Sequence, residues 1–230
     1  MTLQVLYEDN HIIAVVKPAG VLSQGDSSGE RSIIDDVKKY LKDKYKKPGN
    51  VFLGLLHRLD RPVVGIMLFA KTSKGASRLS EQFRNHAIEK TYHAVVLGKP
   101  VKNRGVLTNL LGKDTKSMKA REFEDGKEAN LFYEVVKASP RYSLLKIKIN
   151  TGKFHQIRSQ LSLAGFPILG DIKYGAKEPL SGEVIALCAT GISFRAATEE
   201  KVVNLAIDLP KEWESLFSYP QEGLVLGVNT

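Results

Sequence analysis

The most distinctive stretch of the chain reads Gly54-Leu55-Leu56-His57-Arg58-Leu59-Asp60-Arg61-Pro62-Val63-Val64-Gly65. Four ionisable residues lie within five positions between apolar runs, and Pro62 restricts the backbone that follows them. We expect Arg58 and Arg61 to keep Asp60 ionised, because nearby positive charge favours the carboxylate. An ionised, positioned carboxylate can act as a covalent catalyst on a glycosidic carbon or an electron-poor ring. The alternative is a structural salt bridge between Asp60 and a nearby arginine.

Strand-like and helix-like segments lie on both sides of this loop. Residues 3–7 and 12–17 are β-prone runs around a polar turn, a pattern typical of a hairpin. Apolar residues on one face predict a helix from Ser32 to about Lys46, and Thr72 begins a second helix that runs to Asn85. The apolar run at residues 65–70 predicts a buried strand directly after the loop.

The rest of the chain is rich in predicted strands. We expect strands at residues 91–97, 128–137, 142–149, 184–190 and 202–207, and short helices at 155–164 and 211–217. Residues 99–127 are polar and poor in pattern, so a long excursion with one short hairpin is expected there. Because strands neighbour strands more often than they alternate with helices, the sequence predicts an α+β fold with a mainly antiparallel, mixed sheet flanked by helices.

Composition narrows the class of protein. The 230 residues are 43% hydrophobic and contain no repeat or linker, which predicts one domain over residues 1–230 with its core at about 3–210. No run approaches the roughly 20 apolar residues of a membrane span, and the acidic N-terminus is unlike a secretory signal. A single cysteine, Cys188, excludes an intramolecular disulfide, and we expect a cytoplasmic protein.

The chain is also basic. Thirty-four Lys and Arg against 25 Asp and Glu give a net charge of +9. A positive surface gathers polyanions, which favours RNA or DNA as a partner without choosing between them. Two basic stretches, residues 38–47 and 99–121, are candidates for this contact.

A second polar cluster reads Thr151-Gly152-Lys153-Phe154-His155-Gln156-Ile157-Arg158. Arg158 lies three residues after His155, so both side chains can project from one side of a helix. By itself this segment fits a capped amphipathic helix with a surface arginine equally well. A third segment reads Glu89-Lys90-Thr91-Tyr92-His93-Ala94-Val95-Val96. With this segment included, the functional interpretation is favoured over the structural one.

Together the three segments resemble the RluA family of RNA pseudouridine synthases. Members carry an HRLDR-x-x-x-G loop, a K-x-Y strand and a TG-x-x-HQIR segment, and all three stand here in that order. Residues 9–20, 126–129 and 170–175 match as well, so the resemblance covers about residues 3–210. It implies the pseudouridine synthase catalytic fold and the isomerisation of uridine to pseudouridine in RNA.

The resemblance assigns roles to individual residues. Asp60 would be the catalytic nucleophile, Tyr92 would pack against the target base and serve in proton removal at the ring carbon, and Arg158 would orient Asp60. Arg58 would enter the RNA stack where the flipped uridine was, which offsets part of the unstacking cost. The other motif residues are expected to bind substrate, namely His57, Arg61, His155, Gln156 and Ile157.

The implied partner is structured RNA, either ribosomal or transfer RNA, bound by a monomer without an appended RNA-binding domain. No cofactor or metal is implied, and His57 and His155 with Asp60 lack the local spacing of metal ligands. The chain departs from the family where Val64 replaces Ser or Thr, Lys153-Phe154 replaces Arg-Thr, and Arg195-Ala196 replaces His-Pro. These departures concern substrate fit.

Two functions of other classes also fit parts of the sequence. One is a non-catalytic protein that clamps RNA, against which the intact Asp60, Tyr92 and Arg158 argue. The other is a glycosidase or nucleosidase, which ordinarily uses two carboxylates. Because the key loop holds one acid flanked by arginines, an isomerase fits it better.

Overall fold

The computed structural model describes residues 2–27, 29–182 and 184–218. Its strands form one mixed sheet in the order β1-β2-β4-β10-β5-β9-β8-β6-β7, with β11 beside β10 and β3 beside β4. Within the described residues the pair of β4 and β10 is parallel, and the other paired strands are antiparallel. The predicted α+β class is therefore confirmed.

The elements are as follows. The strands are β1 (Val5–Glu8), β2 (Ile12–Lys17), β3 (Gly54–Leu55), β4 (Val64–Ala70), β5 (Glu89–Leu97), β6 (Arg104–Asp114), β7 (Lys119–Glu122), β8 (Lys127–Ala138), β9 (Tyr142–Ile149), β10 (Leu187–Arg195) and β11 (Val202–Ala206). The α-helices are α1 (Ile33–Lys44), α2 (Ser73–Arg84) and α3 (Gln156–Leu163), and the 3₁₀-helices are η1 (Ile172–Tyr174) and η2 (Lys211–Phe217). None of the helices in the described part of the chain is long and apolar enough to cross a membrane.

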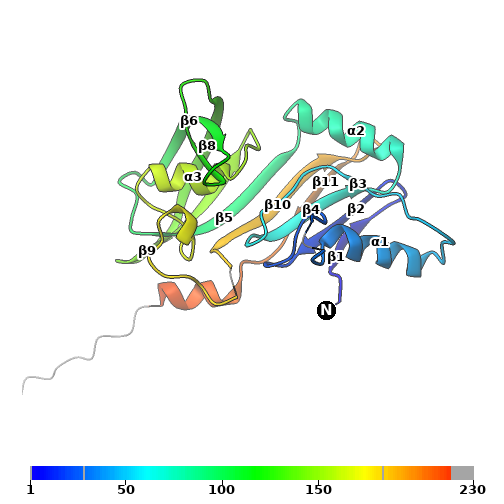
Figure 1. Cartoon of the computed structure of the whole chain (residues 1–230), viewed down its shortest axis with the longest axis horizontal. Helices are drawn as coiled ribbons and strands as arrows, with labels where there is room; N and C mark the ends of the chain where they lie inside the picture. The colour runs from blue at the N-terminus through cyan, green and yellow to red at the C-terminus, as the bar shows by residue number, and fades with distance from the viewer. Residues whose placement is uncertain (1, 28, 183, 219–230) are drawn as a thin grey trace, which may run out of the picture.

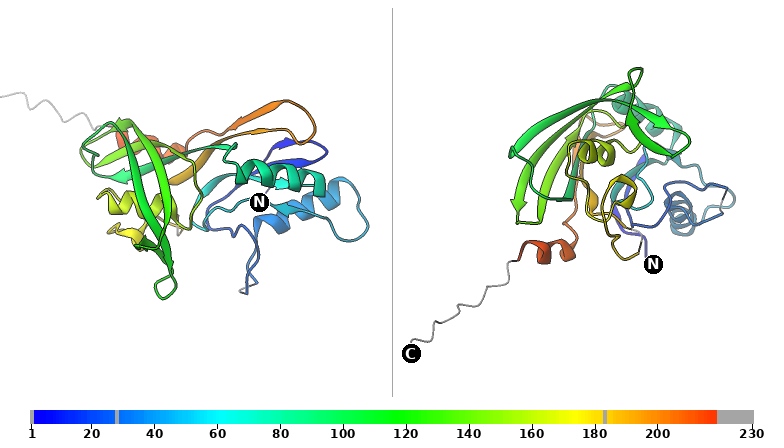
Figure 2. Two further views of the ribbon diagram at one scale, coloured as in Figure 1. Left: turned by 90° about the horizontal axis from the view of Figure 1, so that it is seen from above. Right: turned by 60° about the vertical axis from the view of Figure 1, so that its left-hand side comes forward.

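The sheet has two halves that curve away from each other (Figure 1). One half carries β1 to β4 with α1 and α2, and the other carries β6 to β9 with α3 and η1, while β5 and β10 run between the two. The views in Figure 2 show the same division. Because β3 leads into the loop at residues 56–63 and α3 lies on the opposite half, the two polar motifs face each other across the middle of the molecule.

The central strands are buried on both faces. Successive residues of β4 alternate between two apolar clusters, since Met67 and Phe69 pack with α1 while Ile66 and Leu68 pack with Leu79 of α2. This double burial explains why β2 and β4 read as continuous apolar runs. The helix α2 begins where predicted, with the Thr72 side chain accepting a hydrogen bond from the backbone of Gly75.

Three expectations need correction. Residues 99–127 are not an excursion with one short hairpin, because β6 is an 11-residue strand that pairs with β8 from Arg104 to Leu111 before the β6–β7 hairpin. Its exposed face mixes polar residues with Val106 and Leu110, so the sequence lacks a regular alternation of polar and apolar residues. The strand expected at 184–190 is β10, which begins only at Leu187 and continues to Arg195 because β11 pairs with its second half. The last predicted helix, η2, has the 3₁₀ form.

Candidate active site

Asp60 lies in the loop between β3 and β4, and its neighbour Leu59 anchors that loop. The Leu59 side chain is buried. Its backbone N–H donates to Ser23 Oγ at 3.0 Å, and the Ser23 hydroxyl donates to the Leu59 carbonyl at 2.6 Å. On the far side the Val63 N–H donates to the Asp60 carbonyl at 3.0 Å. The backbone of Asp60 is thus fixed on both sides, while its carboxylate stays 29% exposed.

A fully buried lysine at the end of β2 supports the same loop. Lys17 Nζ donates to the carbonyls of Pro18, Val21 and Arg61 at 2.9, 2.8 and 3.1 Å, which uses the three hydrogens of an ammonium group. Burial lowers the pKa of Lys17 to about 7, while the negative charge of Asp60 acts in the opposite direction. Sequence reasoning assigned no role to Lys17. The feature that could have identified it is a single charged residue at the end of an apolar strand.

Arg158 of α3 connects Asp60 to a second carboxylate. Its Nη1 is 3.0 Å from Asp60 Oδ2, and its Nε and Nη2 donate to Asp171 at 2.7 and 2.8 Å. Both Arg158 and Asp171 are buried. Burial acts to lower the pKa of Arg158, but the hydrogen bonds to Asp171 and the charges of both carboxylates outweigh it and raise the pKa. Asp171 therefore holds Arg158 in place, a role that sequence reasoning missed.

His155 also contacts the carboxylate of Asp60. Its backbone has a positive φ of 50° just before α3, and its Nε2 is 3.5 Å from Asp60 Oδ2. Its Nδ1 is 2.8 Å from the hydroxyl of Tyr174, which accepts a hydrogen bond from the Ala120 N–H. When the Tyr174 hydroxyl donates to Nδ1, the neutral His155 ring carries its proton on Nε2, toward Asp60. Burial lowers the pKa of His155 to about 4, so the ring is neutral near pH 7.

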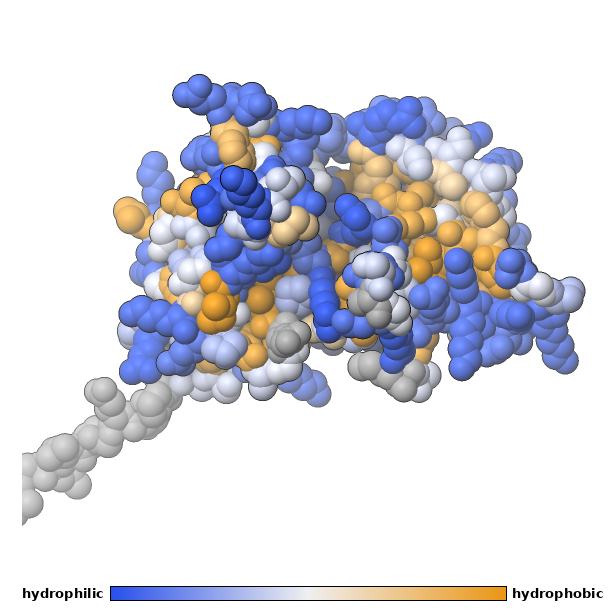
Figure 3. Space-filling view, viewed as in Figure 1, coloured by the Kyte–Doolittle hydropathy of each residue, from blue (hydrophilic) through white to orange (hydrophobic). Residues whose placement is uncertain are grey.

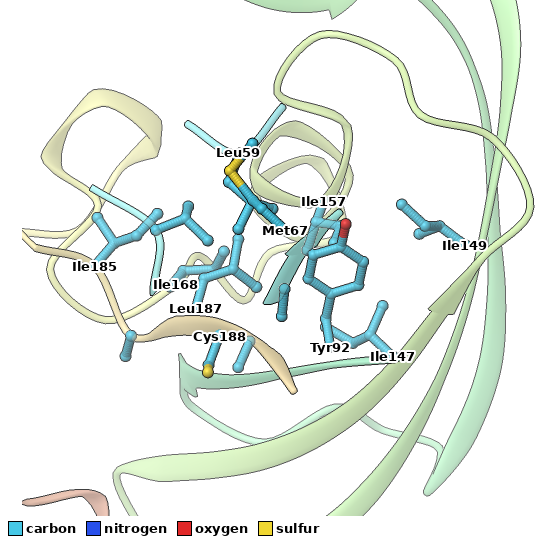
Figure 4. Close-up of a cluster of buried hydrophobic side chains, with 14 of the residues drawn as sticks. Leu59, Met67, Tyr92, Ile147, Ile149, Ile157, Ile168, Ile185, Leu187 and Cys188 are labelled. Atoms are coloured by element: carbon cyan, nitrogen blue, oxygen red, sulfur yellow. The ribbon is translucent and has the colours of Figure 1, made fainter. Parts of the chain in front are cut away.

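Tyr92 projects from β5 into the same region. Figure 4 shows its ring among Ile147, Ile149 and Ile157, and only 8% of the residue is exposed. Burial, together with the negative charge of Asp60, raises the pKa of Tyr92, so the side chain is a neutral phenol. Within the described residues its hydroxyl has no hydrogen-bond partner and is not sealed from solvent.

The predicted residues line two adjoining cavities of about 790 and 90 Å³. The larger is lined by His57, Arg58, Asp60, Arg61, Tyr92 and His155, together with Lys90 and Lys153. The smaller is lined by Gln156, Ile157 and Arg158 and shares Asp60 and Tyr92 with the larger. Figure 3 shows the surface hollowed between the half that carries α3 and the half that carries α2.

Several of these residues make contacts that differ from the expected ones. The Arg61 guanidinium pairs with Glu30 at 2.8 Å and donates to the Gly20 carbonyl at 3.1 Å. The arginine that forms an ion pair with Asp60 is Arg158, at 3.0 Å. Arg58 is exposed at the rim of the cavity.

His57, Gln156 and Ile157 have structural contacts. His57 Nε2 accepts a hydrogen bond from the Leu68 N–H at 3.0 Å, and burial lowers the pKa of this ring to about 3. Gln156 accepts from the Thr151 hydroxyl and the Lys153 N–H and so closes the turn before α3. Ile157 belongs to the main apolar cluster. In the part of the chain that the structure describes, no three His, Cys, Asp or Glu side chains are grouped to hold a metal ion.

Comparisons with known proteins identify the family of the chain. The family model for RNA pseudouridylate synthase matches residues 11–163. The ribosomal large subunit pseudouridine synthase C of Rickettsia typhi is 34% identical over 91% of this chain and 69% of its own. An uncharacterised RNA pseudouridine synthase of Aquifex aeolicus is 32% identical over 96% of this chain and 73% of its own.

The fold has known relatives too. The solved structure of human RNA pseudouridylate synthase domain containing 4 has a TM-score of 0.75, with 24% identity over 92% of this chain and 90% of that one. Human RNA pseudouridylate synthase domain containing 1 has a TM-score of 0.69, with 20% identity over 90% and 83% of the two chains. These two likenesses show the fold. The family model, the sequence relatives and the matched motifs show that the chain belongs to the RluA family of RNA pseudouridine synthases, enzymes that isomerise uridine in RNA.

Proposed function

We propose that this enzyme isomerises specific uridines in structured RNA with Asp60 as its nucleophile. The observation that carries the proposal is the position of Asp60, whose carboxylate is ion-paired with Arg158 and borders both cavities together with Tyr92. A carboxylate paired with a buried guanidinium keeps one orientation. A group that attacks an electron-poor carbon needs to be positioned in this way.

The chemistry requires that uracil be detached, turned and rejoined without hydrolysis. The bond from C1′ to N1 breaks, the base rotates, and a bond from C1′ to C5 forms, while C5 loses a proton and N1 takes one up. The bond that Asp60 forms to the substrate on attack breaks again before product leaves, so the carboxylate is regenerated. Glycosidases pair a nucleophile or base with a second carboxylic acid. Beside Asp60 stand Arg158 and neutral His155 instead, which supports isomerisation over hydrolysis.

The target nucleotide has to leave its stack to reach a carboxylate that lies inside a cavity. Tyr92 offers an aromatic face to the flipped base, and base stacking on such a ring does not depend on sequence. Its hydroxyl oxygen is the proposed acceptor of the C5 proton, and the hydroxyl releases its own proton to solvent, from which it is not sealed. Arg58, exposed at the rim, is placed to fill the gap in the RNA stack.

Ribosomal RNA is the proposed substrate class, because relatives with 34–36% identity are named ribosomal large subunit pseudouridine synthases. Lysines and arginines around the cavity, including Lys90, Lys153 and Arg58, would neutralise RNA phosphates. We propose that a monomer acts on this RNA in the cytoplasm through the single catalytic domain.

The test is tritium release from an RNA transcript of the ribosomal large subunit labelled at C5 of uridine. The purified protein is expected to release tritium and to form pseudouridine without free uracil. Free uracil would indicate a nucleosidase. RNA binding without tritium release from ribosomal or transfer RNA would indicate a clamp, and either outcome would refute the proposal.

A further inference from the structure

A separate cavity of about 450 Å³ lies beside the active site, under the β6–β7 hairpin and the turn that leads into β8. This volume is in the range of sites that hold small organic ligands. Three segments line the cavity. They are residues 111–113 of β6, the residues Phe123, Asp125, Gly126 and Lys127 at the turn into β8, and the pair Lys153-Phe154 that precedes α3. We refer to it as the hairpin cavity.

The ring of Phe123 is presented by a rigid turn. Phe123 is 39% exposed. Its N–H donates to the Leu110 carbonyl, and its carbonyl accepts from the Gly126 N–H, both at 3.0 Å. A Cβ on Gly112 would lie 2.6 Å from the Phe123 ring, and one on Gly126 would lie 2.6 Å from the Leu110 backbone. A side chain at either glycine would therefore displace the Phe123 ring or its turn. Packing of the core does not require this exposed ring.

The second ring, Phe154, joins the hairpin cavity to the active site. It is 36% exposed, and it stacks on His155 with 3.8 Å between ring centroids. Lys113 Nζ lies 5.0 Å from the Phe154 centroid. His155 in turn reaches Asp60 at 3.5 Å, and Lys153 and Phe154 line both cavities. The hairpin cavity therefore adjoins the active site, where a nucleotide next to one held beside Asp60 can reach it.

The charges of the lining suit a nucleotide. Lys113, Lys127 and Lys153 oppose a single lining carboxylate, Asp125. Lysines attract phosphate and aromatic rings stack on bases, and this combination is typical of sites for single-stranded nucleic acid.

We propose that the hairpin cavity binds one nucleotide that flanks the target uridine, with its base against Phe123 and Phe154 and its phosphate at the lysines. This inference rests on the proposed function, since it places RNA in the neighbouring active site. It also gives Phe154 a role, because this ring stands where relatives carry Thr.

The direct test measures the affinity of labelled single-stranded RNA for Phe123→Ala. The probes are an oligouridylate of about ten nucleotides and a ribose-phosphate strand of the same length without bases. The variant is expected to bind oligouridylate about fivefold more weakly or worse, because it lacks one stacking ring. It should bind the baseless strand as tightly as the parent protein does. Phe123→Leu keeps apolar contact with Gly112 but lacks an aromatic face, so it should show the same loss in a folded protein.

The matched control is Phe132→Ala, since Phe132 of β8 is 40% exposed and lies outside the hairpin cavity. Its affinity for both probes should stay within about twofold of the parent value.

Lys113→Gln should reduce the slope of log affinity against log salt by about one, as expected for the loss of one phosphate contact. Unchanged oligouridylate affinity in both Phe123 variants, or an equal loss with the baseless strand, would overturn the inference and leave the rings free for a protein contact.

Kinetics separate this inference from the proposed function. With tritium-labelled ribosomal RNA, Phe123→Leu should raise KM at least about fivefold and change kcat little, because the ring contacts a flanking nucleotide. If the parent enzyme releases tritium and Phe123→Leu has an unchanged KM, the nucleotide-binding role of the hairpin cavity is refuted while the proposed function stands. If the parent releases none, the proposed function fails while the affinity measurements still decide the base contact.

Discussion

Arg158 and Asp60 lie 98 positions apart in the sequence and meet at 3.0 Å. The guanidinium is buried and donates from Nε and Nη2 to the two oxygens of Asp171. Because Asp171 binds Arg158 at two points, the arginine has little freedom to move. It therefore presents a fixed positive charge to Asp60. The catalytic loop is thereby connected to α3 and to the segment before η1.

Replacing Asp60 by Asn tests the proposed nucleophile. The amide has the same shape but cannot attack carbon, so tritium release should fall below about a thousandth of the parent rate. RNA affinity should persist, because the lost charge is negative and had repelled phosphates. Single-turnover tritium release and filter binding measure the two quantities. Turnover near the parent rate would show that another group performs the attack.

Asp171→Asn tests how far the position of Arg158 matters. Breaking a buried ion pair should lower the free energy of unfolding by about 3 kcal/mol. Because Arg158 would lose its fixed position, kcat should fall by up to about a hundredfold. Urea unfolding and tritium release at saturating RNA measure both. Arg104→Gln, which breaks an exposed pair with Glu134, should cost less than about 1 kcal/mol and leave kcat unchanged. A stable but fully active Asp171 variant would contradict this role.

Tyr92→Phe removes one oxygen and keeps the ring. If the ring stacks on the base and the hydroxyl takes part in proton removal, kcat should fall by about 100-fold or more while RNA affinity stays the same. The pair of measurements distinguishes the two roles of the side chain. A rise in KM at constant kcat would restrict Tyr92 to base binding.

Stability should decrease in acid because of His57. Its pKa is about 3 in the folded protein and about 6.5 when unfolded, so between these values the unfolded chain binds more protons. The free energy of unfolding is unaffected above pH 6.5 and falls as pH is lowered from there, by roughly 2 kcal/mol at pH 5. In His57→Gln the amide oxygen can still accept from Leu68 but cannot titrate. Urea unfolding at pH 7 and 5 should show a smaller loss in this variant, and equal losses would exclude His57 as the source.

RNA binding should weaken steeply with salt, because released counterions contribute to the affinity of a chain with a net charge of +9. Of the two basic stretches, the β6–β7 hairpin is the expected RNA contact, since its Ala120 binds Tyr174 beside His155. Lys116→Gln in this hairpin should lower the salt slope by about one, whereas Lys39→Gln on α1 should not. A flat salt dependence of the parent protein would mean that its basic surface does not bind RNA.

Local signals in the sequence were sufficient for most elements. The bounds of β2 and β9 matched the expected ranges, and α2 began at its predicted cap, Thr72. Strand β6 was missed because its exposed face mixes polar and apolar residues and its pairing with β8 is not visible in the sequence. The start of β10 was misplaced because the N–H groups of Ile185 and Ala186 donate to the carbonyls of Pro62 and Leu169 in loops.

The sequence by itself determined the family, the sheet class and the loop that carries Asp60, because motifs and hydrophobic periodicity are properties of neighbouring residues. The partners of the charged side chains were decided only by the tertiary structure. Arg61, adjacent to Asp60 in the chain, pairs with Glu30, whereas distant Arg158 and His155 reach the carboxylate. The physical reason is that an ion pair depends on distance and burial in space, and these are fixed when α3 packs against the sheet.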